Sequence, residues 1–148
     1  MSEPQFIRES IYAALFALVG GSASFQTATR RIKEYADVAS ATQPAILQIE
    51  TGEKWEAPPG KPPIVTLNCR LFVYCESNDP TEPVSTSLNA LLDAVMAALA
   101  PAMAPDGNFR QSLGGLCRHA AISGEITIAE GLSGQSEAIV PIAILVNP

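Results

Sequence analysis

The chain has 148 residues, of which 47% are hydrophobic and only 16% are charged, and its formal net charge is −6. A chain of this length is expected to fold around one core, so we predict a single domain over residues 1–148. No apolar run approaches the ~20 residues of a membrane span, and acidic chains bind nucleic acid poorly. We therefore expect that the chain neither spans a membrane nor binds nucleic acid.

The first predicted element is an amphipathic helix that begins at Pro4 and ends before Gly20-Gly21. Its apolar residues recur at helical spacing, at Ile7, Ile11, Leu15 and Leu18. The next segment, Phe25 to Val38, is strand-like with polar interruptions, and Ala45 to Glu50 predicts a second, short strand. The first part of the chain thus predicts one helix followed by two strands.

A long connection is predicted from Thr51 to Pro63, and it contains Trp55 and four prolines. Loops of this length in compact domains are commonly functional or mobile. An exposed tryptophan often anchors an interface, so Trp55 is a candidate contact residue. The alternative is that its ring folds back over the protein's own core.

The clearest predicted strand runs from Ile64 to Glu76. Alternate residues on one of its faces are apolar and are expected to face the core: Val65, Leu67, Cys69, Leu71, Val73 and Cys75. The opposite face is mixed and ends in two aromatic residues, Phe72 and Tyr74. That composition is typical of a protein–protein contact, so both aromatic residues are candidate interface residues.

A second helix is predicted from Val84 to Leu99, followed by a loop from Ala102 to Gly115. Two strand-like runs close the chain, Cys117 to Ala129 and Glu137 to Val146. The last run is apolar on both faces, so one face can pack on the helices while the other needs a partner. Pro141 in its middle cannot donate to a sheet ladder, so we expect this strand at an edge or bulged there.

These elements predict an α+β fold with the order αβββαββ. Hairpin-connected strands favour a mainly antiparallel sheet of four to five strands, and the two amphipathic helices are expected to pack on one face of it. Parallel strands linked by crossover helices would contradict this prediction.

Residue patterns that carry catalysis or bind metal are sparse. Cys117 and His119 form the only Cys/His pairing, and side chains two apart on a strand lie about 6–7 Å apart, too far for a direct hydrogen bond. The sequence contains no phosphate-loop, zinc-protease or calcium-loop motif. The odd number of cysteines argues against a disulfide framework and favours a reducing compartment. We therefore predict no enzymatic activity, no catalytic residues, no metal site and no cofactor.

Three segments of the chain resemble the tail terminator proteins (minor tail protein U) of long-tailed bacteriophages and prophages. They are RESIYAALFALVGG running into FQTATRRIKEYADV, then VTLNCRLFVYCESNDPTEPVSTSLNALLDAVMAAL, and finally GGLCRHAAISGEITIAEGLSGQSEAIVPIAILV. Their order and spacing carry the resemblance over nearly the whole chain. It implies a non-enzymatic structural virion protein whose subunits form a hexameric ring.

The resemblance also implies where such a ring acts. It would sit on the head-proximal end of the tail tube, stop polymerisation of the tube and present a surface for the head. Its partners would be further copies of itself, the major tail tube protein and head–tail connector proteins. It would be assembled in the bacterial host cytoplasm and would become part of the virion tail.

Two charged segments are candidate contacts between copies. One of them is positively charged and contains Arg30, Arg31 and Lys33. The acidic turn contains Glu76, Asp79 and Glu82. It opens the part of the chain at 76–148, which carries two basic and eight acidic residues. A ring needs two different, complementary patches on each subunit, and these segments fit that need.

Three alternatives remain open from the sequence. The chain can be another head–tail joining or tail completion protein of similar fold, a cytoplasmic small-molecule-binding α+β domain, or a thiol enzyme. A binding domain should contain a concave apolar pocket. A ring subunit should instead present its apolar surface at a face between subunits.

Overall fold

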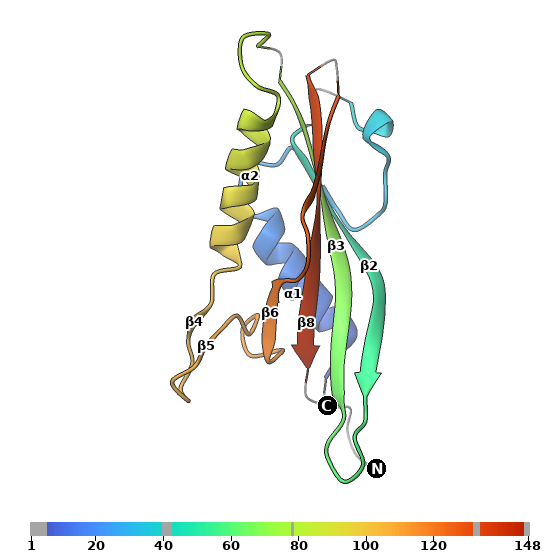
Figure 1. Cartoon of the computed structure of the whole chain (residues 1–148), viewed down its shortest axis with the longest axis vertical. Coiled ribbons are helices and arrows are strands. Elements are labelled where there is room, and N and C mark those ends of the chain that lie inside the picture. Colours follow the sequence, from blue (N-terminus) through green and yellow to red (C-terminus); the bar gives the residue numbers. More distant parts are fainter. Residues whose placement is uncertain (1–5, 40–42, 78, 132–133, 147–148) are drawn as a thin grey trace.

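The computed structural model describes residues 6–39, 43–77, 79–131 and 134–146. Within these residues, two α-helices and a mostly antiparallel sheet of six strands make an α+β fold, the predicted class (Figure 1). The helices are α1 (Arg8–Gly20), α2 (Ser85–Ala98) and a short 3-10 helix, η1 (Tyr35–Asp37). The sheet contains β1 (Thr27–Thr29), β2 (Ala45–Glu56), β3 (Ile64–Glu76), β6 (His119–Ile122), β7 (Thr127–Glu130) and β8 (Gln135–Val146). A separate ribbon pairs β4 (Ala102–Met103) with β5 (Phe109–Arg110).

The strands of the main sheet follow the order β1-β2-β3-β8-β6, and β7 also pairs with β8. All pairs are antiparallel except that of β1 and β2, which is parallel. This differs from the predicted order αβββαββ and the four- to five-stranded sheet. The difference arises because the last-but-one predicted strand is divided in two, and because a ribbon forms in the segment predicted as a loop.

Both helices pack on the same face of the sheet. The alternate residues of β3 predicted to face the core are all buried, at 5% exposure or less. They form one hydrophobic cluster with Ile11 and Leu15 of α1 and with Leu88 and Val95 of α2. Alternate residues of β8 join the same cluster: Ala138, Val140, Ile142, Ile144 and Val146. The period-two pattern of β3 and β8 therefore sets which face the helices cover.

The closing strand β8 lies inside the sheet, between β3 on one side and β6 and β7 on the other. The prediction that Pro141 places it at an edge is therefore wrong. The proline is accommodated by a break in the neighbouring strand, because residues 123–126 separate β6 from β7 beside it. The Ser123 N–H donates to the Pro141 carbonyl at 3.0 Å, so the side of Pro141 that lacks an N–H faces this break.

Two segments before β3 also differ from prediction. The strand β2 continues to Glu56 through an irregularity between Glu50 and Gly52, so Trp55 lies on a strand and not in a long loop. Gly52, with φ 148, allows this irregularity, and pairing with β3 extends a strand whose own sequence is charged. In the segment predicted as a strand from Phe25 to Val38, the regular elements are only β1 and η1.

A smaller hydrophobic cluster lies on the opposite face of the sheet. It contains the buried residues Val38, Ala45, Leu47 and Tyr74, with Phe72 packed against them. Towards β8, this face is only half-buried, at Ile139, Pro141, Ala143 and Leu145. The second face of the closing strand is thus apolar and incompletely covered, as its sequence predicts.

Candidate subunit interface

Five acidic residues gather at one end of the sheet, at the top of Figure 1. The Ser77 N–H donates to the Gly134 carbonyl at 2.8 Å, which holds the segment after β3 beside the hairpin of β7 and β8. The first segment supplies Glu76, Asp79 and Glu82, and the hairpin adds Glu130 and Glu137. We call these five residues the acidic end. The two hairpin carboxylates were not among the predicted contacts, because only the strand register brings them to this place.

The negative charge of the acidic end is not neutralised within the described part of the chain. Ion pairs there join Arg8 to Glu53, Arg30 to Glu9 and Glu50, Lys54 to Glu56, and Arg110 to Asp106. The Asp79 carboxylate accepts hydrogen bonds from the Thr81 hydroxyl and N–H at 2.6 and 2.9 Å, and these bonds lower its pKa. Glu130 and Glu137 line a hollow of about 260 Å³. This end therefore offers carboxylates to a cationic partner.

The exposed basic residues lie on the face of the sheet away from the helices. Arg31 and Lys33 are exposed and flank Ile32, which is 70% exposed. We call Arg31, Ile32 and Lys33 the basic segment. The Tyr74 hydroxyl donates to the Lys33 carbonyl at 2.7 Å, so the backbone of this segment is anchored to β3 on the face away from the helices. Neither cation belongs to an ion pair among the described residues.

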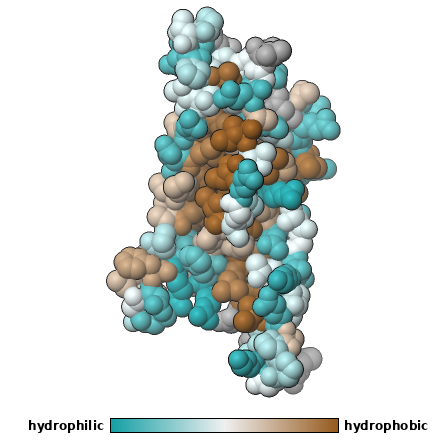
Figure 2. Space-filling view, in the orientation of Figure 1, coloured by the Kyte–Doolittle hydropathy of each residue, from teal (hydrophilic) through white to brown (hydrophobic). Residues whose placement is uncertain are grey.

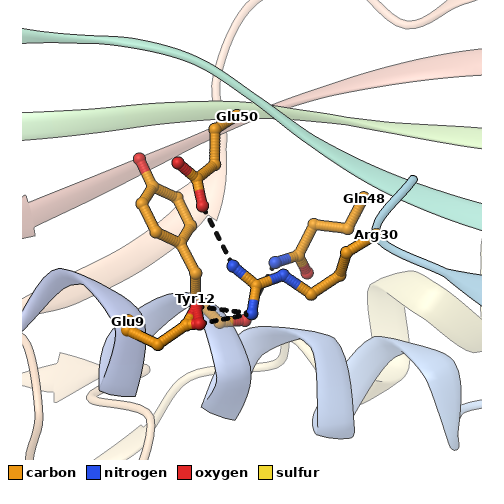
Figure 3. Close-up of polar contacts among 5 residues, drawn as sticks. All are labelled: Glu9, Tyr12, Arg30, Gln48 and Glu50. Carbon is orange, nitrogen blue, oxygen red and sulfur yellow. Dashed lines mark hydrogen bonds and ion pairs between the residues drawn. The ribbon is translucent and has the colours of Figure 1, made fainter. Parts of the chain in front are cut away.

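The third predicted cation, Arg30, is held inside the subunit (Figure 3). Its guanidinium pairs with Glu9 of α1 at 2.6 Å and with Glu50 of β2 at 2.9 Å, and its side chain is only 28% exposed. The prediction that Arg30 belongs to an open patch is therefore not supported by its position. Arg30 instead ties the end of β1 to both α1 and β2.

A buried polar contact lies directly beside Arg30 (Figure 3). The Gln48 side chain, only 2% exposed, donates from Nε2 to the Tyr12 carbonyl at 2.8 Å. Burial raises the pKa of the Tyr12 hydroxyl to about 12, so it is neutral at physiological pH. These contacts link α1 to the sheet, so this polar cluster stabilises the fold and is not an open site.

The three aromatic candidates differ in accessibility. Tyr74 is only 3% exposed, so the prediction that its ring contributes to a contact surface is wrong, because its ring is buried in the cluster with Val38, Ala45 and Leu47. Phe72 is half-buried and remains partly accessible. Trp55 is 50% exposed, and its ring centroid lies 6.4 Å from that of Phe6. Trp55 thus contacts the chain's own N-terminal segment and remains accessible, and its role in an interface stays a prediction.

An apolar groove runs between α2 and the outer strands β6 and β7 (Figure 2). Met96, Leu99 and Ile122 line one part of it. On β7, Ile128 lies on the helix side of the sheet, because it pairs with the buried core residue Ala138. Met96 is 55% exposed and Ile128 is 47% exposed, although both are large hydrophobic side chains. Around Met96 and Ile122, the surface is hollowed by about 350 Å³. Exposed apolar surface of this kind marks interaction sites. The sequence did not single out this groove.

The cysteine–histidine pair does not form a reactive couple in this geometry. The Cys117 thiol points to the Gln111 carbonyl at 3.7 Å, and His119 Nδ1 accepts the Gln111 N–H at 3.2 Å. Burial raises the pKa of the Cys117 thiol to about 11, which disfavours the nucleophilic thiolate. Among the described residues, no group of three or more His, Cys, Asp or Glu side chains is placed to hold a metal ion.

No protein-family model matches the chain, and no curated protein matches it either. None of the helices in the described ranges is long and apolar enough to cross a lipid bilayer. The candidate site therefore rests on the geometry of the acidic end, the basic segment and the apolar groove.

Proposed function

We propose that the chain is the subunit of a homo-oligomeric ring that caps a phage tail tube, stops its polymerisation and joins it to the head. The observation that carries this proposal is the separation of unpaired, opposite charges on one sheet. The basic segment is anchored to Tyr74 on the face away from the helices, whereas Glu130 of the acidic end shares the helix side of β7 with Ile128. Two different complementary patches make a heterologous contact, which closes into a ring when the rotation allows it.

The resemblance to tail terminator proteins supplies the tube, the head and the copy number of six. The exposed apolar groove and the incompletely covered second face of β8 support assembly, because a free subunit leaves this surface in water. Exposed ion pairs contribute only ~0–1 kcal/mol each, so charge should set the register and rate of assembly more than its affinity. We expect a ring that is weak and salt-sensitive in solution and that the tube end stabilises.

The proposal is tested by the length of tail tubes. Tube protein polymerised with a small proportion of this chain should form shorter tubes, each with a ring at one end in negative-stain electron microscopy. The double variant Arg31→Glu/Lys33→Glu should lose this effect while its circular dichroism stays unchanged. Lys61→Glu is the matched control, because Lys61 is also exposed but lies in the loop between β2 and β3. Tubes of unchanged length with the natural chain would refute the proposed function.

A further inference from the structure

We propose that the apolar groove between α2 and β7 receives the basic segment of the next copy in the ring. This inference rests on the proposed function and names the contact through which the copies join. The groove has an apolar centre with an acidic residue near each end of β7. The basic segment has an apolar residue with a cation on each side. The two patterns are complementary in both charge and apolarity.

The apolar part of this contact joins Ile32 to the groove. Ile32 is 70% exposed and belongs to neither hydrophobic cluster of the described residues. Ile128 faces the helix side of the sheet, because it pairs with the core residue Ala138, but it is 47% exposed. Burying two such side chains against each other removes apolar surface from water, at about 25 cal/mol per Å².

The charges next to these side chains favour the same register. Glu125 precedes β7 and Glu130 ends it, so two exposed carboxylates bracket Ile128. Arg31 and Lys33 bracket Ile32 in the same way. Both sets of charges lack ion-pair partners among the described residues. A cation beside Glu130 would also lie at the acid-lined hollow formed with Glu137.

The basic segment of the same copy cannot fill the groove. The groove lies on the helix side of the sheet, because Ile128 pairs with the buried core residue Ala138. The Lys33 carbonyl is also fixed to Tyr74 on the face away from the helices. The occupant is therefore a second copy, and its own groove remains open for a third. This head-to-tail arrangement builds a ring.

The strand β7 adds main-chain groups to the contact. It pairs with β8 on one side, and all four of its residues are exposed. An outer strand presents N–H and C=O groups that an incoming segment can bind. The strand has only four residues, so the number of such bonds is small. Such a small number of hydrogen bonds is consistent with a ring that needs the tube end as its template.

Disulfide cross-linking tests the contact directly. In a Cys117→Ser background, the double variant Ile32→Cys/Ile128→Cys should form disulfide-linked ladders up to the full ring when mildly oxidised with tail-tube protein. Each single cysteine variant should give no ladder, because the contact joins two different residues. The matched control is Ile32→Cys/Met103→Cys, since Met103 is 61% exposed but lies on β4 outside the groove. It should give no ladder.

A charge exchange gives a second measurement that does not depend on a new thiol. Lys33→Glu should weaken assembly by about tenfold in sedimentation, and adding Glu130→Lys should restore most of it. Rings that form without a ladder from Ile32→Cys/Ile128→Cys would overturn this contact and leave the proposed function standing. Rings absent with the natural chain and tube protein would overturn both.

Discussion

The charged and apolar side chains are paired or buried at one side of the sheet and exposed at the other. At the β1–β2 side, Arg30 is paired with two carboxylates and Gln48 is buried against α1. At the β6–β7 side, Ile128 and Met96 are about half exposed, and the nearby carboxylates have no ion-pair partners among the described residues. We call these the closed side and the open side. The closed side uses its polar groups to hold the fold, whereas the open side leaves them available to a partner.

The adjacent residues Arg30 and Arg31 have different environments. Arg30 and Arg31 are neighbours in sequence, but Arg30 bridges α1 and β2 while Arg31 is exposed without an ion pair among the described residues. A run of basic residues is therefore not one patch. The bend after β1 turns the first cation towards the subunit's own carboxylates and leaves the later ones accessible. Substitutions on the two sides can therefore test whether one side stabilises the fold and the other side serves assembly.

The largest expected difference is between two isoleucines. Ile46, which is 1% exposed on the closed side, should cost about 2–5 kcal/mol of unfolding free energy when replaced by alanine. Ile128→Ala on the open side should cost less than about 1 kcal/mol, because its side chain is already half in water. Urea unfolding followed by circular dichroism measures both. Equal losses would mean that the open side is part of the subunit's core.

The two arginines should separate stability from assembly. Arg30→Ala should lower the free energy of unfolding by about 1 kcal/mol, because it removes both of its ion pairs. Arg31→Ala should change it by less than ~0.5 kcal/mol but should weaken ring formation. Urea unfolding and sedimentation, made on the same samples, distinguish the effects. A stability loss at Arg31 as large as that at Arg30 would remove the distinction between the two sides.

A smaller effect concerns the carboxyl of Asp79 at the acidic end. Its hydrogen bonds from Thr81 lower its pKa from the usual 3.8. A carboxyl with a lower pKa in the folded state stabilises that state above the unfolded pKa, and this contribution is lost as the pH falls through the folded pKa. Thr81→Ala should return the pKa of Asp79 towards 3.8, as measured by NMR titration. The variant removes the hydroxyl bond and keeps the N–H bond, so an unchanged pKa would show that the hydroxyl does not lower the pKa of Asp79.

The smallest effect is expected at Cys117. Because burial raises the pKa of its thiol to about 11, modification by a thiol reagent should be slow at pH 8 and should accelerate as the pH rises towards that value. Cys117→Ser should leave the fold and ring assembly unchanged. Thiol-dependent turnover, or assembly lost in a folded Cys117→Ser protein, would contradict the non-enzymatic proposal.

Regular alternation made much of the fold predictable. The bounds of β3 and the face it buries follow from its alternation of apolar residues, and the two helices follow from their apolar stripes. The local sequence pattern does not predict the length of β2, because its second half is charged and becomes a strand only by pairing with β3. It also does not report the place of β8, because a break in the neighbouring strand accommodates Pro141 inside the sheet.

The candidate site was less predictable than the fold. Arg31, Lys33 and the residues Glu76, Asp79 and Glu82 could be named from charge alone. The role of Arg30 depends on Glu9 and Glu50, which are distant in sequence, and the burial of Tyr74 depends on the path of the segment before β2. The apolar groove cannot be predicted from the sequence, because Ile128 and Met96 are apolar residues in a strand and a helix and only the structure shows that they are exposed.

The central claim is that the open side joins copies of this chain into a ring. Native mass spectrometry of the natural chain, alone and with tail-tube protein, tests it most directly. We expect one homo-oligomer, a hexamer, at least when tube protein is present. The Arg31→Glu/Lys33→Glu variant should not form this hexamer. A strict monomer in both conditions would contradict the account.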